Sequence, residues 1–296
     1  MRVAMLGAGV MGRNIARVMA SGGEQVTVFS RSRKTLDGAR GALAGSEHAA
    51  RLSFVASIGE AVSGADVVIE SVPESLDLKL GVLAETESAA PDGVVIVTNT
   101  SSLPLDRLAA ALQAPERFLG WHWFNPAHLI PLVEVVPTAL TDPGVVAWSV
   151  QRLGAVGKRP LVLSRPVDGF LANRLQYALI REALALVDAG VATPEQIDAV
   201  LTDCLGLRWA VLGPMRSTDL AGITTAMAVA TELFPKLSNA DRPQACLTDL
   251  AEQGRLGLSA GAGFYAYPDP DEVLDTRDRL LASVWHATQP GRSERP

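Results

Sequence analysis

The ten residues that decide the fold run VAMLGAGVMG, from Val3 to Gly12. An apolar run leads directly into a G-x-G-x-x-G pattern, and a segment with helical periodicity follows it. In such a setting the first glycine permits a tight turn, the second admits a phosphate to the backbone, and the third lets helix and strand pack closely. The helix N-terminus adds free N–H groups and the positive end of a dipole. The stretch therefore predicts a diphosphate-binding turn at the start of an α/β domain.

Short apolar runs alternate with helical stretches from Met1 to about Arg165, which is typical of a parallel sheet covered on both faces. The expected strands are 3–6, 26–29, 53–55, 67–69, 94–98, 119–123, 133–136 and 161–163, and the expected helices between them are 13–20, 34–43, 76–90 and 145–153. Beyond residue 169 only helices are expected, at 170–189, 194–201, 220–233 and 245–253. The predicted fold class is α/β: an N-terminal Rossmann-type doubly wound sheet (1–166), an all-helical C-terminal domain (167–285) and a flexible polar tail (286–296).

Composition limits the class of protein. The chain has 296 residues, of which 48% are hydrophobic, and a net charge of −6, so a sizeable core is expected and nucleic acid is an unfavourable partner. Cys204 and Cys246 are too few for a disulfide framework or a cysteine-based zinc site, and no metal is expected. Neither an export signal nor a membrane-spanning run is apparent in the sequence. We expect a cytoplasmic protein that binds no membrane.

The glycine pattern predicts a dinucleotide cofactor, and its candidate contacts are Gly7, Gly9, Val10, Met11 and Gly12. NAD sites place an acidic residue about 20 residues further on, where it binds the ribose 2′-hydroxyl. Here Ser30 stands at that point, followed by Arg31, Ser32, Arg33 and Lys34. A hydroxyl with guanidinium neighbours accepts a 2′-phosphate, so Ser30, Arg31 and Arg33 favour NADP, with NAD as the alternative. The cations could instead only solvate the start of the next helix.

Candidate catalytic residues follow the fifth expected strand and lie within the sixth and seventh. Asn99-Thr100-Ser101-Ser102 stands at the carboxyl edge, where ligands bind in open α/β sheets, which makes Asn99 a cofactor candidate. His122 lies among aromatic residues, and Glu134 lies twelve residues later inside an apolar run. A carboxylate buried there needs a partner, and adjacent strands would bring it to the imidazole. The pair would then act as a general acid–base dyad, although a lone strand histidine is commonly a core residue.

The chain resembles the 3-hydroxyacyl-CoA dehydrogenase family over nearly its whole length. The resemblance rests on Gly7-x-Gly9-x-x-Gly12, Asn99-Thr100-Ser101-Ser102, His122-x-Phe124-Asn125-Pro126, Leu132-Val133-Glu134-Val135, Gly169-Phe170-x-x-Asn173-Arg174-Leu175, Gly213-Pro214 and Gly261-x-Gly263-Phe264-Tyr265. It implies that His122 and Glu134 form the catalytic dyad and that Ser101 and Asn173 bind the reacting oxygen. It also implies that Glu74 and Lys79 contact the nicotinamide half of the cofactor.

The implied function is an oxidoreductase that transfers hydride between NADP(H) and the 3-hydroxyl or 3-oxo carbon of a 3-hydroxyacyl compound, in the form of a free acid, a carrier-bound acyl group or a CoA ester. Family members that act on CoA esters carry a long Lys-rich helical excursion between the second and third strands, whereas residues 31–52 here hold one Ala-rich helix with Lys34 as its only lysine. The segments 169–178 and 205–214 look more like the branch of gulonate 3-dehydrogenase, lens crystallins and carnitine dehydrogenase. A free small hydroxy acid is therefore the alternative substrate, which Arg208 could bind through its carboxylate, or Arg208 could pair with a structural acid.

Two further classes of protein are compatible with the sequence. A non-catalytic cofactor-binding protein is one, and the β-hydroxyacid dehydrogenases are another, although the catalytic lysine of that family has no counterpart on the first long helix. The lysine that often precedes the Gly-x-Gly-Phe-Tyr motif is also missing, since Gly257-Leu258-Ser259-Ala260 stands there. A broad apolar stripe from Leu171 to Leu186 indicates either burial within the helical domain or the interface of a homodimer.

Overall fold

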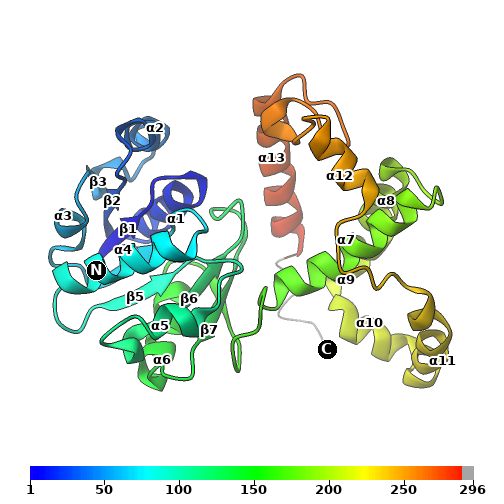
Figure 1. Ribbon diagram of the computed structural model, residues 1–296, viewed down its shortest axis with the longest axis horizontal. Coiled ribbons are helices and arrows are strands. Elements are labelled where there is room, and N and C mark those ends of the chain that lie inside the picture. The colour runs from blue at the N-terminus through cyan, green and yellow to red at the C-terminus, as the bar shows by residue number, and fades with distance from the viewer. Residues whose placement is uncertain (289–296) are drawn as a thin grey trace. The chain divides into compact units, whose positions relative to one another are not determined.

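The computed structural model describes residues 1–288 (Figure 1). The chain divides into two compact units, Met1–Arg174 and a second unit that begins at Leu175. The first unit is an α/β domain and the second is helical, as the sequence predicts.

The first unit is built on one eight-stranded sheet with the order β3-β2-β1-β4-β5-β6-β7-β8. All neighbouring strands pair in parallel except β6 and β7, which are antiparallel. The strands are β1 Arg2–Leu6, β2 Gln25–Phe29, β3 Leu52–Val55, β4 Val67–Glu70, β5 Val95–Thr98, β6 Phe118–Trp123, β7 Leu132–Pro137 and β8 Arg159–Val162. From β1 the chain adds β2 and β3 on one side of the sheet and then returns to add β4 on the other side of β1. The order of strands therefore reverses between β1 and β4. Ligands of doubly wound sheets bind at this switch point.

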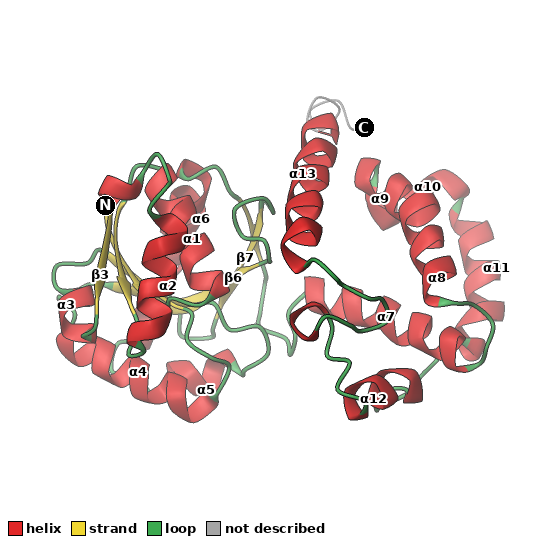
Figure 2. Ribbon diagram, turned by 90° about the horizontal axis from the view of Figure 1, so that it is seen from above, coloured by secondary structure: helices red, strands yellow, loops and turns green. Residues whose placement is uncertain are grey.

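Helices cover both faces of this sheet (Figure 2). Two hydrophobic clusters separate by face, one packed with α1, α2 and α6 and the other with α3, α4 and α5. The helical segments of this unit are α1 Val10–Ser21, α2 Arg33–Leu43, η1 Ala49–Arg51, α3 Ile58–Val62, α4 Leu76–Ala89, α5 Leu105–Ala109, η2 Pro115–Arg117 and α6 Pro143–Ala155. Residues of the central strands are almost fully buried, which accounts for their continuous Val/Ile runs.

The second unit is helical throughout its described part. Its segments are α7 Ala172–Asp188, which starts within the first unit, α8 Pro194–Val200, the π-helical turn η3 Leu201–Leu205, α9 Gly206–Val211, α10 Gly213–Ala221, α11 Ile223–Leu233, η4 Phe234–Lys236, α12 Ala245–Glu252, η5 Leu258–Ala260 and α13 Pro270–Thr288. Within residues 1–288, none of the helices combines the length and apolar character needed to span a bilayer.

Several predicted element boundaries differ from the structure. The predicted helix 220–233 is interrupted by Gly222, whose φ of +91° ends α10 and precedes α11. Helix α13 is absent from the prediction, although Asp269 caps it by accepting the N–H groups of Asp271 and Glu272. The predicted polar tail begins inside this helix, which continues to Thr288, and the rest of that tail lies outside the described residues. The short helices α3 and α5 are also absent from the prediction, because five residues hold too little periodicity to detect.

Candidate active site

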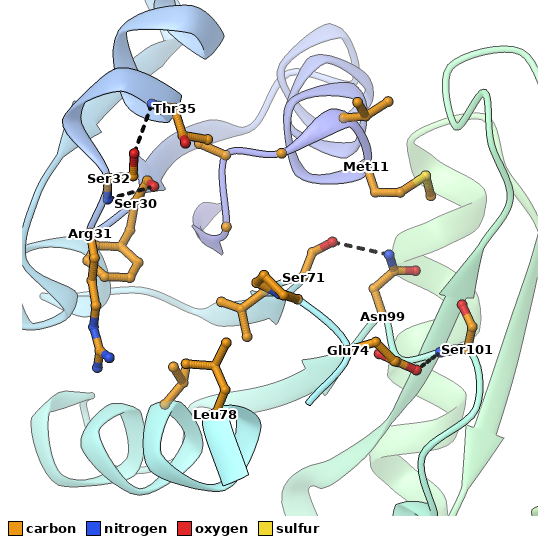
Figure 3. Close-up of a pocket in the computed structure, with 18 residues that line it drawn as sticks. Met11, Ser30, Arg31, Ser32, Thr35, Ser71, Glu74, Leu78, Asn99 and Ser101 are labelled. Atoms are coloured by element: carbon orange, nitrogen blue, oxygen red, sulfur yellow. Dashed lines mark hydrogen bonds between the residues drawn. The ribbon is translucent and has the colours of Figure 1, made fainter. Parts of the chain in front are cut away.

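The glycine-rich turn opens onto a pocket at the carboxyl ends of β1, β2, β4 and β5, with a volume of about 660 Å³ (Figure 3). Ser30, Ser32 and Thr35 lie at one end of it, and Glu74, Asn99 and Ser101 lie at the other. All of the predicted cofactor residues in the turn except Gly12 line the pocket: Gly7, Gly9, Val10 and Met11.

The three glycines of the motif play separate roles. A Cβ on Gly12 would overlap the carbonyl oxygen of Gly7, and a Cβ on Gly7 would overlap that of Ser71. Gly7 also has a φ of +115°, a conformation that side chains disfavour. A Cβ on Gly9, in contrast, would meet nothing within 4 Å of protein. Open space at Gly9, which is also the N-cap of α1, fits a cofactor diphosphate that approaches the backbone there.

The adenosine-side candidates lie where β2 passes into α2. Ser30 is buried, and its Oγ accepts the backbone N–H of Ser32 at 3.2 Å. Arg31 is exposed, and its guanidinium forms an ion pair with Glu85 of α4 at 3.0 Å. Arg33 starts α2 with an exposed side chain and does not line the pocket. Two of the three predicted residues therefore face the pocket, and Glu85 is a neighbour that sequence reasoning missed.

His122 and Glu134 are directly opposite each other in the antiparallel register of β6 and β7. Their side chains meet, with His122 Nδ1 2.8 Å from Glu134 Oε2, and both are buried. The other carboxylate oxygen, Oε1, accepts the N–H groups of Leu171 at 3.2 Å and Ala172 at 2.8 Å, where α7 begins. Nδ1 therefore acts as the donor to Glu134, which leaves Nε2 as the nitrogen able to exchange a proton with a ligand.

Aromatic rings enclose the imidazole. The ring centroid of Phe124 lies 4.6 Å from that of His122, and that of Phe170 lies 5.2 Å away. Phe170 has a φ of +50°, which is unusual for a residue with a side chain. This backbone conformation places the Phe170 ring against His122. It also directs the N–H groups of Leu171 and Ala172 at Glu134.

Ser101 and Asn173 are brought together by hydrogen bonding, since Asn173 Nδ2 donates to the backbone oxygen of Ser101 at 3.4 Å. Asn99 connects the pocket to β6: its Nδ2 donates to Ser71 Oγ at 3.2 Å, and its Oδ1 accepts the N–H of Trp123 at 2.9 Å. Asn99 thus fixes the end of β6, one residue beyond His122.

Glu74 organises the turn that presents Ser101. Its Oε1 accepts the Thr100 hydroxyl at 2.6 Å and the N–H groups of Ser101 and Ser102 at 2.8 and 2.9 Å. Burial alone would raise the pKa of Glu74, but these hydrogen bonds, with the charge of Lys79, hold the pKa below its usual range. Glu74 is therefore an ionised acceptor at neutral pH.

Lys79 is almost completely buried beneath the pocket. Its Nζ contacts both oxygens of Glu70 at 2.8 and 2.9 Å and lies 3.4 Å from Glu74. The contact of Lys79 with the cofactor stays a prediction, because its Nζ is directed at these two carboxylates. Glu70, which also accepts the Thr98 hydroxyl at 2.6 Å, was missed from the sequence. It ends the apolar run of β4, and a carboxylate in an apolar run is the signal that identifies Glu134.

Arg208 lies on α9 of the second unit with its side chain exposed, so its predicted role in substrate binding stays a prediction. No group of three or more His, Cys, Asp or Glu side chains within residues 1–288 is arranged to hold a metal ion.

A dinucleotide turn and a buried histidine–carboxylate pair in one α/β domain are typical of nicotinamide-dependent dehydrogenases, which are oxidoreductases. The chain belongs to the 3-hydroxyacyl-CoA dehydrogenase family: residues 2–166 match its NAD-binding domain and residues 169–267 match its C-terminal domain.

Similar proteins span different substrates. The chain is 41% identical over 302 residues to L-carnitine dehydrogenase of Streptomyces coelicolor, covering 97% of this chain and 94% of that protein. It is 32% identical over 284 residues to 3-hydroxybutyryl-CoA dehydrogenase of Mycobacterium tuberculosis, covering 90% of this chain and 98% of that protein. Among solved structures, the NAD⁺-dependent dismutase 5-formyl-3-hydroxy-2-methylpyridine 4-carboxylic acid 5-dehydrogenase has a TM-score of 0.92 at 32% identity, covering 97% of this chain and 98% of that one.

Two glycine substitutions test the geometry of the turn. Gly9→Ala should leave the free energy of unfolding within about 1 kcal/mol of wild type, because the added Cβ meets no protein atom, yet it should weaken cofactor binding by blocking the diphosphate. Gly12→Ala should destabilise the protein by at least about 1–3 kcal/mol, because its Cβ overlaps backbone. Chemical denaturation and cofactor titration by fluorescence would measure both effects. Tight cofactor binding by a folded Gly9→Ala variant would contradict the assigned site.

Proposed function

We propose that the protein transfers hydride between NADP(H) and the 3-hydroxyl or 3-oxo carbon of a 3-hydroxyacyl compound, and that this compound is a free hydroxy acid rather than a CoA ester. The observation that carries the reaction is the contact of His122 Nδ1 with Glu134. Neither residue lines the glycine-lined pocket, but Asn99 does, and it accepts the N–H of Trp123, the residue after His122. The bound nicotinamide would supply or accept the hydride.

His122 is the proposed general acid–base group. With Nδ1–H held by Glu134, Nε2 would take the hydroxyl proton when the alcohol is oxidised and return it when the ketone is reduced. The carboxylate stabilises the positive charge that the ring then carries. Burial of both groups among Phe124 and Phe170 keeps bulk water from competing for these positions.

Ser101 and Asn173 are the proposed partners of the reacting oxygen. Ser101 lines the pocket together with Asn99, and the hydrogen bond from Asn173 brings this second polar residue to Ser101. Donors at this position would stabilise negative charge as it develops on the substrate oxygen. Glu74 would serve the same end by fixing the backbone turn on which Ser101 lies.

The His122→Gln variant tests the proposed base. We expect the dissociation constant for the cofactor to stay within about twofold and turnover to fall by roughly 10²–10⁴, because glutamine cannot exchange the proton. His48→Gln, on a turn remote from the pocket, is the matched control and should retain wild-type turnover. Steady-state kinetics would measure turnover, and cofactor titration of the folded variants would measure the dissociation constant. Wild-type turnover by His122→Gln would remove this residue from the mechanism.

The free-acid proposal rests on the short β2–β3 connection and on relatives. Between Phe29 and Leu52 the chain forms only α2 and η1, with Lys34 as the single lysine. The relatives named for L-carnitine and for a pyridine carboxylic acid point the same way. A guanidinium binds a carboxylate through two hydrogen bonds, and Arg208 is the proposed partner. The 3-hydroxybutyryl-CoA dehydrogenase relative supports the CoA ester as the alternative.

The NADP proposal rests on the residues at the end of β2. Ser30 places a hydroxyl where a carboxylate would repel a 2′-phosphate, and Arg31 lies at the same rim of the pocket. NAD remains the alternative, since a solved relative is NAD⁺-dependent.

Initial rates with NADPH and NADH, each against acetoacetyl-CoA and a matched free 3-oxo acid, test both proposals. We expect the highest kcat/KM for NADPH with the free acid. Ser30→Asp should lower the NADPH-to-NADH ratio of kcat/KM by about 10–100-fold, the equivalent of a lost charge-assisted hydrogen bond of roughly 1.5–3 kcal/mol. A strong NADH preference in the wild type would overturn the cofactor proposal, and a higher efficiency with the CoA ester would overturn the substrate proposal.

We also propose that the protein is a homodimer formed through its helical unit. Among the described residues from Leu175 onward, Leu184 is the single large hydrophobic side chain that is buried. Large apolar side chains such as Leu175, Met215, Leu220 and Phe234 are each more than 60% exposed. A helical unit of this size needs a hydrophobic core. In a homodimer, the exposed apolar side chains of one copy would be buried against those of the second copy.

Sedimentation equilibrium tests this proposal. We expect a mass near 62 kDa, twice the 31.2 kDa of one chain, and Leu220→Asp should shift the equilibrium toward monomer and expose the helical unit to limited proteolysis. Asp219→Asn, at the neighbouring exposed position, is the control. A wild-type monomer with a protease-resistant helical unit would contradict the proposal.

A further inference from the structure

Lys158 lies outside the pocket and is nevertheless buried, with 8% of its surface exposed. Its Nζ donates to the carbonyl oxygens of Ala127 at 2.6 Å and Ile130 at 2.9 Å, and it lies 5.5 Å from the ring centroid of Trp123. Within residues 1–288 its ammonium forms no ion pair. A buried charge without a counter-ion is costly, so the contacts that hold it require an explanation.

The two carbonyls belong to the segment 124–131, which connects β6 to β7. Ala127 is fully buried, and a buried carbonyl oxygen needs a donor. The segment supplies part of its own bonding, since Pro126 accepts the N–H groups of Leu129 and Ile130. Pro131 accepts the N–H of Arg159, and Lys158 supplies the donors for the carbonyls of Ala127 and Ile130. Lys158 therefore holds the segment that connects β6 to β7 by hydrogen bonds to its backbone.

That connection sets the geometry of the proposed catalytic pair. His122 faces Glu134 because β6 and β7 pair in one register, and a slip by one residue would move every side chain to the opposite face. Lys158 contacts the β6–β7 hairpin at two places. One is the ring of Trp123, the residue after His122, and the other is the pair of carbonyls in the connecting loop. Phe124, which starts the loop, packs against the imidazole.

We propose that Lys158 is a positioning residue, whose ammonium fastens the β6–β7 connection and so holds the His122 imidazole on Glu134. The inference rests on the proposed role of His122 as the acid–base group, but the position of the ring can be measured without turnover.

The charge on Lys158 is itself sensitive to pH. Burial lowers the pKa of Lys158 to about 8, and the groups that contact it are two neutral carbonyls and an indole ring. The ammonium therefore loses its proton at mildly alkaline pH and becomes a weaker donor to the loop. Arginine would stay charged across this range.

The experiment compares Lys158→Met with Lys158→Arg, and Lys34→Met on α2 is the matched control. The reporter is the hydrogen-bonded Nδ1–H proton resonance of His122 in the free enzyme, assigned by its loss in His122→Gln. We expect Lys158→Met to shift or broaden this resonance and to lower kcat at least about tenfold, with the cofactor dissociation constant within about twofold. Lys158→Arg should restore most of both properties, and Lys34→Met should change neither.

A Lys158→Met variant with the wild-type resonance and wild-type kcat would overturn the proposal, and so would a fall in kcat with the resonance unchanged. If Lys158→Met does not fold, a pH titration replaces it. The wild-type resonance should then change with a midpoint near pH 8 while that of Lys158→Arg persists, and identical titrations would overturn the proposal. Failure of the proposed function is recognised separately, by turnover that survives His122→Gln.

Discussion

The structure of the site depends on one buried contact, between the imidazole of His122 and the carboxylate of Glu134. Burying a carboxylate is unfavourable unless its oxygens are satisfied, and here one oxygen faces the imidazole while the other accepts two N–H groups where α7 begins. This carboxylate joins β6, β7 and the first residues of α7. The strand register, the aromatic enclosure of the ring and the course of the chain into α7 all serve to satisfy it.

A second buried carboxylate performs a similar task under the pocket. Glu70 binds Lys79 and Thr98, and Lys79 in turn approaches Glu74, which shapes the turn of Ser101. Two buried charged networks therefore support the site, one around His122 and Glu134 and the other around the turn of Ser101. Because each network is cross-linked between strands, the polar groups of the site are preorganised before any ligand binds.

Much of this architecture could be predicted from the sequence, because its signals are local. The apolar runs indicate the fold class, and a carboxylate within an apolar run identifies Glu134 and its histidine partner. The contacts of Glu70 and Lys158 could not be predicted, since they depend on which loop passes over which strand end. Helix α13 was not predicted as a separate helix, although most of it falls within residues 167–285, the range predicted for the helical domain. The ion pair of Arg31 with Glu85 joins residues 54 positions apart, a separation that sequence pattern does not resolve.

The partner of Arg31 also affects the energetics of cofactor selection. Arg31 already forms an ion pair with Glu85 of α4. A 2′-phosphate that binds Arg31 would therefore replace one anionic partner by another. The free energy of discrimination is then the difference between two ion pairs that dissolved salt screens to a similar degree. Selectivity between the two nicotinamide dinucleotides would thus change less with ionic strength than the affinity for either one.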